Sequence, residues 1–248
     1  MVDEGETSDP SVVGGALFRP VRSGNTFEDT VARLLQTIRL GIVAPGEALP
    51  SERNLATRFS VSRDTVRDAI RSLADAGFLV SKRGRYGGTF VSDTLPIGTL
   101  GITGIVQSTP TAAEIDDILG LREIIELGAV GVATCKSLSA TDRELLWNRF
   151  QEVKDAPIDD YRRVDSRFHL TIAELTGLPS LVSLIADNRM RVNQLLNNIP
   201  LLVPNIDHSN DQHEAIVVAI LTGDKERAVE AMREHLEGSA ALLHGFLS

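Results

Sequence analysis

Residues 26–92 carry three helical patterns followed by two short apolar segments, an order that few folds share. The spacing of aliphatic residues predicts helices over 27–40, 52–59 and 63–76, and strands over 78–81 and 89–92. A tight polar turn, Phe59-Ser60-Val61-Ser62, joins the second and third helices, and a basic, glycine-rich tip separates the strands. This order predicts a winged helix-turn-helix, a unit that inserts one helix into a groove of DNA.

The third predicted helix separates apolar from basic side chains. Its apolar stripe contains Val66, Ala69, Ile70 and Leu73, and the stripe beside it contains Arg63, Arg67 and Arg71 at intervals of four. Arginines presented in this way can pair with guanine edges or with phosphates. The alternative is a solvated face on which the arginines pair with Asp64, Asp68 and Asp75. The hairpin tip favours DNA, because a wing along the phosphate backbone gives partners to Lys82, Arg83 and Arg85.

The charge of the chain is unevenly divided. The formal net charge of the 248 residues is −9, which taken alone argues against a nucleic-acid-binding protein. However, residues 16–95 hold 12 basic and 8 acidic side chains, whereas residues 96–248 hold 13 basic and 22 acidic ones. The net charge therefore does not exclude DNA binding. It predicts weak non-specific affinity, with specificity left to a few arginines.

Other features of the composition exclude several classes of protein. Cys135 is the single cysteine, which rules out a disulfide framework and a thiolate metal cluster. Residues 1–25 are acidic and rich in Gly and Ser, lack the pattern of a signal peptide and are expected to be a disordered tail. No stretch reaches the roughly 18 apolar residues of a membrane span. We expect a cytoplasmic protein that does not bind membranes.

Three motifs of the N-terminal unit point to a known family. They are Leu49-Pro50-Ser51-Glu52-Arg53-Asn54-Leu55-Ala56, Val61-Ser62-Arg63-Asp64-Thr65-Val66-Arg67-Asp68-Ala69-Ile70 and Leu73-Ala74-Asp75-Ala76-Gly77-Phe78-Leu79. This unit resembles the DNA-binding domain of the GntR family of bacterial transcriptional regulators. The resemblance implies that Arg53, Arg63 and Arg67 contact operator bases and that Gly88 enters the minor groove. It also implies phosphate contacts for Ser51, Thr65 and Arg85.

The rest of the chain is helical almost to its end, so the predicted fold class is mainly α. Residues 93–110 mix Gly, Pro, Ser and Thr with scattered aliphatic residues and predict a linker. Beyond the linker, residues 111–248 predict an all-helical bundle. Its helices are expected over 112–135, 139–154, 158–176, 179–198, 209–222 and 224–246.

Three histidines of this bundle lie at or beside apolar helical faces. His213 shares a face with Ile216, Val217 and Ile220, and His235 shares one with Ala231, Met232, Leu242 and Phe246. His169 lies at the edge of such a stripe, one turn after Asp165. A carboxylate and an imidazole four residues apart can chelate one metal, and two more histidines would complete three nitrogens and one oxygen. The alternative is a set of hydrogen-bonded core histidines. His208 and His244 lack this support and are expected at the surface or around the site.

Arg122 is the other charged residue on an apolar helical face. The face carries Ile115, Ile118, Leu119, Ile125, Ala129 and Ala133, and Glu126 lies one turn beyond Arg122. A buried Arg–Glu pair is weak evidence for stability, because both charges lose their hydration. One interpretation is a structural pair that fixes the helix register. The other is that Arg122 also binds the carboxylate of an anionic ligand beside the metal.

Motifs of this half also match a known domain. They are Arg122-x-x-x-Glu126, Asp165-x-x-x-His169, Gln212-His213-Glu214-Ala215-Ile216, Gly223-Asp224 and Met232-Arg233-Glu234-His235-Leu236. Residues 111–245 resemble the FCD domain, the effector domain of the FadR subfamily of GntR regulators. The resemblance implies a divalent metal ion held by Asp165, His169, His213 and His235, with a small carboxylate completing its shell and a fatty-acyl ligand disfavoured. Zinc is expected first, with nickel or manganese possible.

These observations predict a ligand-responsive transcriptional regulator, most simply a repressor. A homodimer would place two recognition helices on a pseudo-palindromic operator. Residues 111–248 would bind a small organic acid and form the dimer. Two alternatives use the same helical domain, namely a metal-dependent enzyme and a direct sensor of the metal ion.

Overall fold

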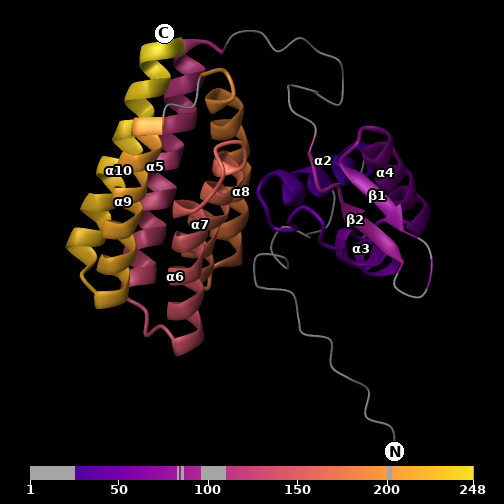
Figure 1. Ribbon diagram of the computed structural model, residues 1–248, viewed down its shortest axis with the longest axis horizontal. Coiled ribbons are helices and arrows are strands. Elements are labelled where there is room, and N and C mark those ends of the chain that lie inside the picture. Colours follow the sequence, from indigo (N-terminus) through magenta and orange to yellow (C-terminus); the bar gives the residue numbers. More distant parts are fainter. Residues whose placement is uncertain (1–25, 83, 85–86, 96–109, 200–202, 248) are drawn as a thin grey trace, which may run out of the picture.

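The computed structural model describes residues 26–82, 84, 87–95, 110–199 and 203–247, which form two groups of elements (Figure 1). The N-terminal group contains α2 (Thr26–Arg39), α3 (Glu52–Phe59), α4 (Arg63–Asp75), β1 (Leu79–Lys82) and β2 (Gly88–Val91). The C-terminal group contains α5 (Ala112–Thr134), α6 (Ala140–Lys154), α7 (Tyr161–Leu175), α8 (Pro179–Leu196), α9 (Val203–Thr222) and α10 (Lys225–Leu247). The mainly α fold, a winged helix-turn-helix followed by a helical bundle, is confirmed.

Local capping explains where the helix-turn-helix turns. The Ser51 and Ser62 hydroxyls cap α3 and α4 by accepting hydrogen bonds from the backbone N–H groups of Asn54 and Thr65. Between the two helices, Ser60 adopts a left-handed conformation with φ 56°, which ends α3 and turns the chain into α4. The antiparallel hairpin runs in register from Leu79 opposite Val91 to Lys82 opposite Gly88. One apolar cluster, with Leu34, Ile38, Leu55, Phe59, Val66, Leu73 and Leu79 among its members, joins these elements.

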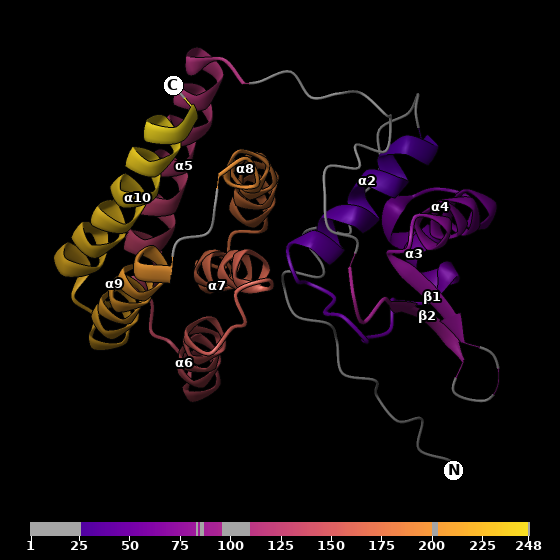
Figure 2. The same ribbon diagram turned by 45° about the horizontal axis from the view of Figure 1, so that its top comes forward.

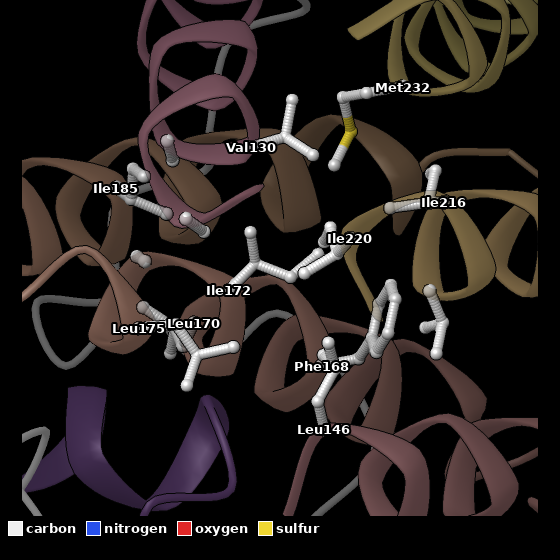
Figure 3. Packing of buried hydrophobic residues seen from close by; sticks show 14 of the residues in the cluster. Val130, Leu146, Phe168, Leu170, Ile172, Leu175, Ile185, Ile216, Ile220 and Met232 are labelled. Atoms are coloured by element: carbon white, nitrogen blue, oxygen red, sulfur yellow. The ribbon is translucent and has the colours of Figure 1, made fainter. Parts of the chain in front are cut away.

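The bundle is built around a second apolar core. Aliphatic and aromatic side chains from α5, α7, α9 and α10 point toward one another in its centre, as Figure 3 shows for Val130, Phe168, Ile172, Ile216, Ile220 and Met232. Capping boxes begin two of the helices, with Thr111 and Glu114 starting α5 and Ser139 and Asp142 starting α6. Among the helices that the structure describes, none is long and apolar enough to cross a bilayer.

Three details differ from the sequence prediction. Helix α9 begins at Val203, not at 209, because Pro204 lies in the first turn, where a helix needs no backbone N–H donor. Helix α7 begins at Tyr161, since residues 158–160 form a turn closed by the Asp160 N–H and the Pro157 carbonyl. Phe246 is 50% exposed, so the expected apolar face of α10 ends before it. The expected tail and most of the expected linker lie outside the described residues.

The two groups touch at the end of α2, which faces α7 and α8 (Figure 2). Leu40 is fully buried and belongs to the bundle core. Gly41 has φ 67°, a left-handed conformation that favours glycine, and a Cβ atom there would lie 2.8 Å from the Arg163 guanidinium of α7, which would have to shift. The side chains of Arg33 and Gln36 both donate hydrogen bonds to Asp187 of α8. The N-terminal group therefore sits on two helices of the bundle.

Candidate DNA-reading face and metal centre

Helix α4 turns its apolar stripe inward and its arginines outward, as the sequence predicted. Val66, Ala69, Ile70 and Leu73 are buried in the N-terminal core, whereas Arg63, Arg67 and Arg71 are exposed. Arg53, at the start of α3, is exposed as well. The geometry is therefore that of a recognition helix packed on its apolar side, with cationic groups exposed on the other side.

Carboxylates accompany two of these arginines. The Nη1 and Nη2 atoms of Arg67 lie 2.9 Å from Asp64 and 3.2 Å from Glu52, and Nη2 of Arg63 lies 3.9 Å from the same Glu52 oxygen. The hydrogen bond and the charge of Glu52 raise the pKa of Arg67 above its usual value. The Asp64 contact is one that the solvated-face alternative expects. The sequence analysis assigned no role to Glu52, although this residue lies in the first motif, three residues after Leu49.

The other predicted DNA-contact residues surround this face. Ser51 and Thr65 lie at the N-termini of α3 and α4, with the Thr65 hydroxyl 2.8 Å from that of Ser62. Gly88 opens β2 at the described edge of the hairpin tip, and Arg85 lies outside the described residues. Beside Gly88, the ammonium of Lys82 lies 4.6 Å from the centre of the Phe90 ring. The DNA-contact roles of these residues stay predictions.

Four predicted metal ligands meet inside the bundle. Asp165 and His169 come from α7, His213 from α9 and His235 from α10, and one ligand atom from each lies within 4.8 Å of the others. All four residues are buried. Asp165 and His213 are 48 positions apart in the sequence, so the cluster is a product of the fold.

The imidazoles are oriented toward one point. The Nε2 atoms of His169 and His213 lie 3.7 and 3.3 Å from the same Asp165 oxygen, Oδ1. On its outer side, His235 places Nδ1 3.3 Å from Ser209 Oγ and 3.3 Å from Gln212 Oε1, and His169 places Nδ1 against Glu126. The Nε2 atoms of all three histidines are buried without a hydrogen-bond partner among the described residues. Three inward nitrogens without partners fit a divalent cation, and the outer nitrogen of His235 is hydrogen-bonded as that of a metal ligand usually is.

The electrostatics of the cluster favour the ligand forms of these groups. Burial lowers the pKa values of His213 and His235, so both imidazoles are held neutral. Burial alone would raise the pKa of Asp165, but Arg189 and His169 outweigh it and hold that pKa well below its usual range. Neutral imidazoles and an ionised carboxylate are the forms that bind metals.

Arg189 is the residue of this site that the sequence analysis missed. Its side chain is fully buried, pairs with Asp165 and lies 3.7 Å from Glu126. Its Nε and Nη1 atoms have no hydrogen-bond partner in the described part of the chain. A signal was present, because Arg189 shares the helical stripe of the buried residues Val182, Ile185, Ala186 and Val192. The same reasoning that selected Arg122 would have selected it.

Arg122 is buried as predicted and is held by the protein itself. Its Nε donates to Glu126 at 3.2 Å, and its Nη1 donates to the Ser239 hydroxyl at 2.6 Å. Burial lowers the pKa of Arg122 from its usual value. Two arginines and two carboxylates thus balance their charges beside the histidine cluster. The effector contact predicted for Arg122 is neither shown nor contradicted by this arrangement.

Two family models match the two halves of the chain. Residues 26–91 match the model described as bacterial regulatory proteins, gntR family, and residues 117–238 match that of the FCD domain. The HTH-type transcriptional repressor NanR of Escherichia coli strain K12 is 30% identical over 259 aligned positions, covering 97% of this chain and 93% of NanR. This chain belongs to the GntR family. It is a DNA-binding transcriptional regulator with an FCD domain and not an enzyme.

One further relative and one solved structure are also similar to this chain. A regulatory protein of Escherichia coli strain K12, named for the L-lactate dehydrogenase operon, is 30% identical over 226 positions, which cover 88% of this chain and 84% of the relative. The solved structure of Escherichia coli McbR/YncC superposes with a TM-score of 0.54 at 19% identity, over 89% of this chain and 97% of that one. At this identity the structural likeness supports the fold alone.

Proposed function

We propose that this GntR-family regulator is a repressor whose operator binding is controlled by a small carboxylate at a metal site in its FCD domain. The observation that carries the proposal is the set of unpartnered Nε2 atoms of His169, His213 and His235, which face Asp165 inside the bundle. Buried polar atoms left without partners are costly, so a ligand that satisfies them is expected. NanR is named as a repressor, which supports the proposed direction of control.

The donor set fits zinc first, with nickel or manganese as alternatives, because all three accept mixed nitrogen and oxygen ligands. Asp165, His169, His213 and His235 would hold the ion. When bound, it supplies a Lewis acid to which a carboxylate can attach. The relative named for the L-lactate dehydrogenase operon makes a small hydroxy acid a reasonable first candidate.

We assign the carboxylate contact to Arg122, joined by Arg189. Both guanidinium groups are buried beside the four donors, and Arg189 keeps two nitrogens without partners in the described residues. Charge-assisted hydrogen bonds from a planar guanidinium suit a carboxylate.

On the DNA side, we propose a homodimer that binds a pseudo-palindromic operator. Arg53, Arg63 and Arg67 would contact bases and Gly88 the minor groove, while Ser51, Thr65 and Arg85 would contact phosphates. In this scheme residues 26–92 bind DNA, and residues 111–248 bind the effector and form the dimer. Residues 93–110 link these two domains.

The contact between the two units offers a route for control. Helix α7 carries Asp165 and His169 on one side and meets Gly41 of the DNA-binding unit through Arg163. Helix α8 carries Arg189, which pairs with Asp165, and Asp187, which accepts from α2. A ligand that shifts α7 and α8 would therefore move the DNA-binding unit. It must bind the DNA-incompetent arrangement more tightly, by the same free energy by which it weakens operator binding.

The test combines elemental analysis with DNA binding. The purified protein should contain about one divalent ion per chain, and His213→Ala combined with His235→Ala should abolish it. The matched control is His208→Ala with His244→Ala, which removes two solvent-accessible histidines and should leave the metal content unchanged. Operator fragments selected from random duplexes should be released by a small organic acid only from metal-loaded protein.

Two outcomes would contradict the proposal. Undiminished metal in the His213→Ala/His235→Ala protein would place the ion elsewhere. If operator affinity followed metal occupancy and no organic acid changed it, the protein would be a direct metal sensor instead.

A further inference from the structure

Glu52 lies where the two helices of the reading face meet. It is the first residue of α3, fixed by the Ser51 cap on one side and by the buried Leu55, Ala56 and Phe59 on the other. One of its carboxylate oxygens, Oε2, lies 3.2 Å from Arg67 and 3.9 Å from Arg63, which are one turn apart on α4. A single carboxylate therefore gathers two cationic side chains from the neighbouring helix.

Stability is a poor explanation for this cluster. The side chains of Glu52, Arg63 and Arg67 are 31%, 60% and 46% exposed, and ion pairs at such sites contribute little to folding. A carboxylate beside a DNA-contacting surface also repels phosphates, which weakens the non-specific part of DNA binding. If the cluster has a role, that role is therefore in the specific recognition of DNA and not in folding stability or in non-specific binding.

The geometry leaves the arginines able to bind DNA while they are held. A guanidinium has five N–H donors, and each terminal nitrogen carries two of them. Glu52 pairs with Nη2 of Arg67 and Asp64 pairs with Nη1. Each of these two nitrogens therefore keeps one N–H that can bind a base edge. A side chain that is already ordered loses less conformational entropy when it binds.

We propose that Glu52 is a positioning residue for base recognition, which holds Arg63 and Arg67 toward base edges and away from phosphates. The inference rests on the base-contact roles proposed above for these two arginines. It assigns specificity to a carboxylate that itself carries no base contact. The expected consequence is a high ratio of operator affinity to non-specific affinity in a domain of low positive charge.

The experiment measures this ratio for the full-length protein by fluorescence anisotropy, with a duplex selected from random sequences by the wild type and with a scrambled duplex. Glu52→Gln should lower the ratio about tenfold, the contribution of one good base contact. It should also tighten binding to the scrambled duplex and steepen the salt dependence by about 0.9, the slope expected for one added phosphate contact. Glu52→Asp keeps the charge but shortens the side chain, so it should lower the ratio without changing the slope.

Asp68→Asn is the matched control, because it removes one exposed carboxylate from α4 that pairs with neither Arg63 nor Arg67 in the described part of the chain. An unchanged ratio in Glu52→Gln, or an equal fall in Asp68→Asn, overturns the proposal. So does a wild-type ratio in Glu52→Asp, since Glu52 would then act by charge alone. Glu52→Asp also serves as the test if Glu52→Gln does not fold. Arg67→Ala tests the base contact of Arg67 separately from the positioning role of Glu52. Equal weakening of binding to both duplexes would refute base recognition by Arg67, whatever the Glu52 variants show.

Discussion

The two halves of the molecule use the same chemistry, arginine beside carboxylate, in opposite settings. On α4, Arg63 and Arg67 pair with Glu52 and Asp64 at the surface, where water competes for every contact. In the bundle, Arg122 and Arg189 pair with Glu126 and Asp165 where almost no side-chain surface is exposed. Exposed pairs can exchange partners at low cost, which suits the DNA contacts proposed for these arginines. Buried pairs cannot be broken cheaply, which suits groups that must hold a site in shape.

The largest effect should come from breaking the buried pair of Asp165 and Arg189. Asp165→Leu leaves a buried guanidinium without its closest partner and should lower the free energy of unfolding by about 3–5 kcal/mol. Adding Arg189→Met removes the stranded charge and should recover most of the loss. Urea denaturation in the presence of EDTA measures both without a contribution from bound metal. Asp64→Ala, which breaks an exposed pair, should leave the urea midpoint unchanged, and an equal loss there would contradict the comparison.

A smaller effect is expected from Glu126, which holds the outer nitrogen of His169. Glu126→Gln should weaken divalent-metal affinity by about 10- to 100-fold, because outer partners fix the orientation of a ligating imidazole. Competition with a chromophoric chelator measures the affinity, and a thermal melt of the metal-free protein checks the fold. Glu123→Gln is the control, since Glu123 is on the same helix but pairs with the half-exposed Arg233. Equal metal affinity in wild type and Glu126→Gln would show that Glu126 does not orient His169.

The fold was predictable to the extent that it is local. The turn between α3 and α4, the hairpin and the helical faces of α5 and α7 follow from capping serines, glycines and apolar spacing within a few residues. The start of α9 was predicted six residues late, because a proline can end a helix or occupy its first turn, and the neighbouring sequence favours neither.

The candidate metal site was predictable only in part. The helical spacing of Asp165 and His169, and the apolar faces around His213 and His235, identified four donors from three separate helices. The ionic network behind them was not visible, since the approach of Arg189 to Asp165 depends on how α8 packs against α7. Helical periodicity shows which side of a helix is buried, but it does not show which buried side chains meet.

On the exposed side of the comparison, Arg67→Ala should affect DNA binding and not folding. Operator affinity should fall about tenfold, with relaxed preference at one base position, because the proposed base contact of Arg67 would be lost. The melting temperature should stay that of the wild type, since the side chain is half exposed. Anisotropy titrations with single-base operator variants measure the preference. A large fall in melting temperature would show that the exposed cluster also stabilises the fold.

The smallest effect should come from Asp187, which lies between the two settings: its side chain is 45% exposed, yet it joins α2 to the helix that carries Arg189. Asp187→Ala should change operator affinity in the absence of organic acid by less than twofold, because a half-exposed pair contributes little. It should, however, reduce several-fold the factor by which the acid weakens operator binding, since one of the contacts that link α8 to α2 is lost. Coupling is reciprocal, so the factor by which operator DNA weakens acid binding should fall equally. Asp117→Ala, which breaks an exposed pair that joins α5 to Arg191 of α8 and not α8 to α2, should leave both factors unchanged. Wild-type coupling in Asp187→Ala would mean that the signal reaches the DNA-binding unit through the packing of Leu40 in the bundle core and of Gly41 against Arg163 of α7, and that the hydrogen bonds between α2 and α8 do not carry it.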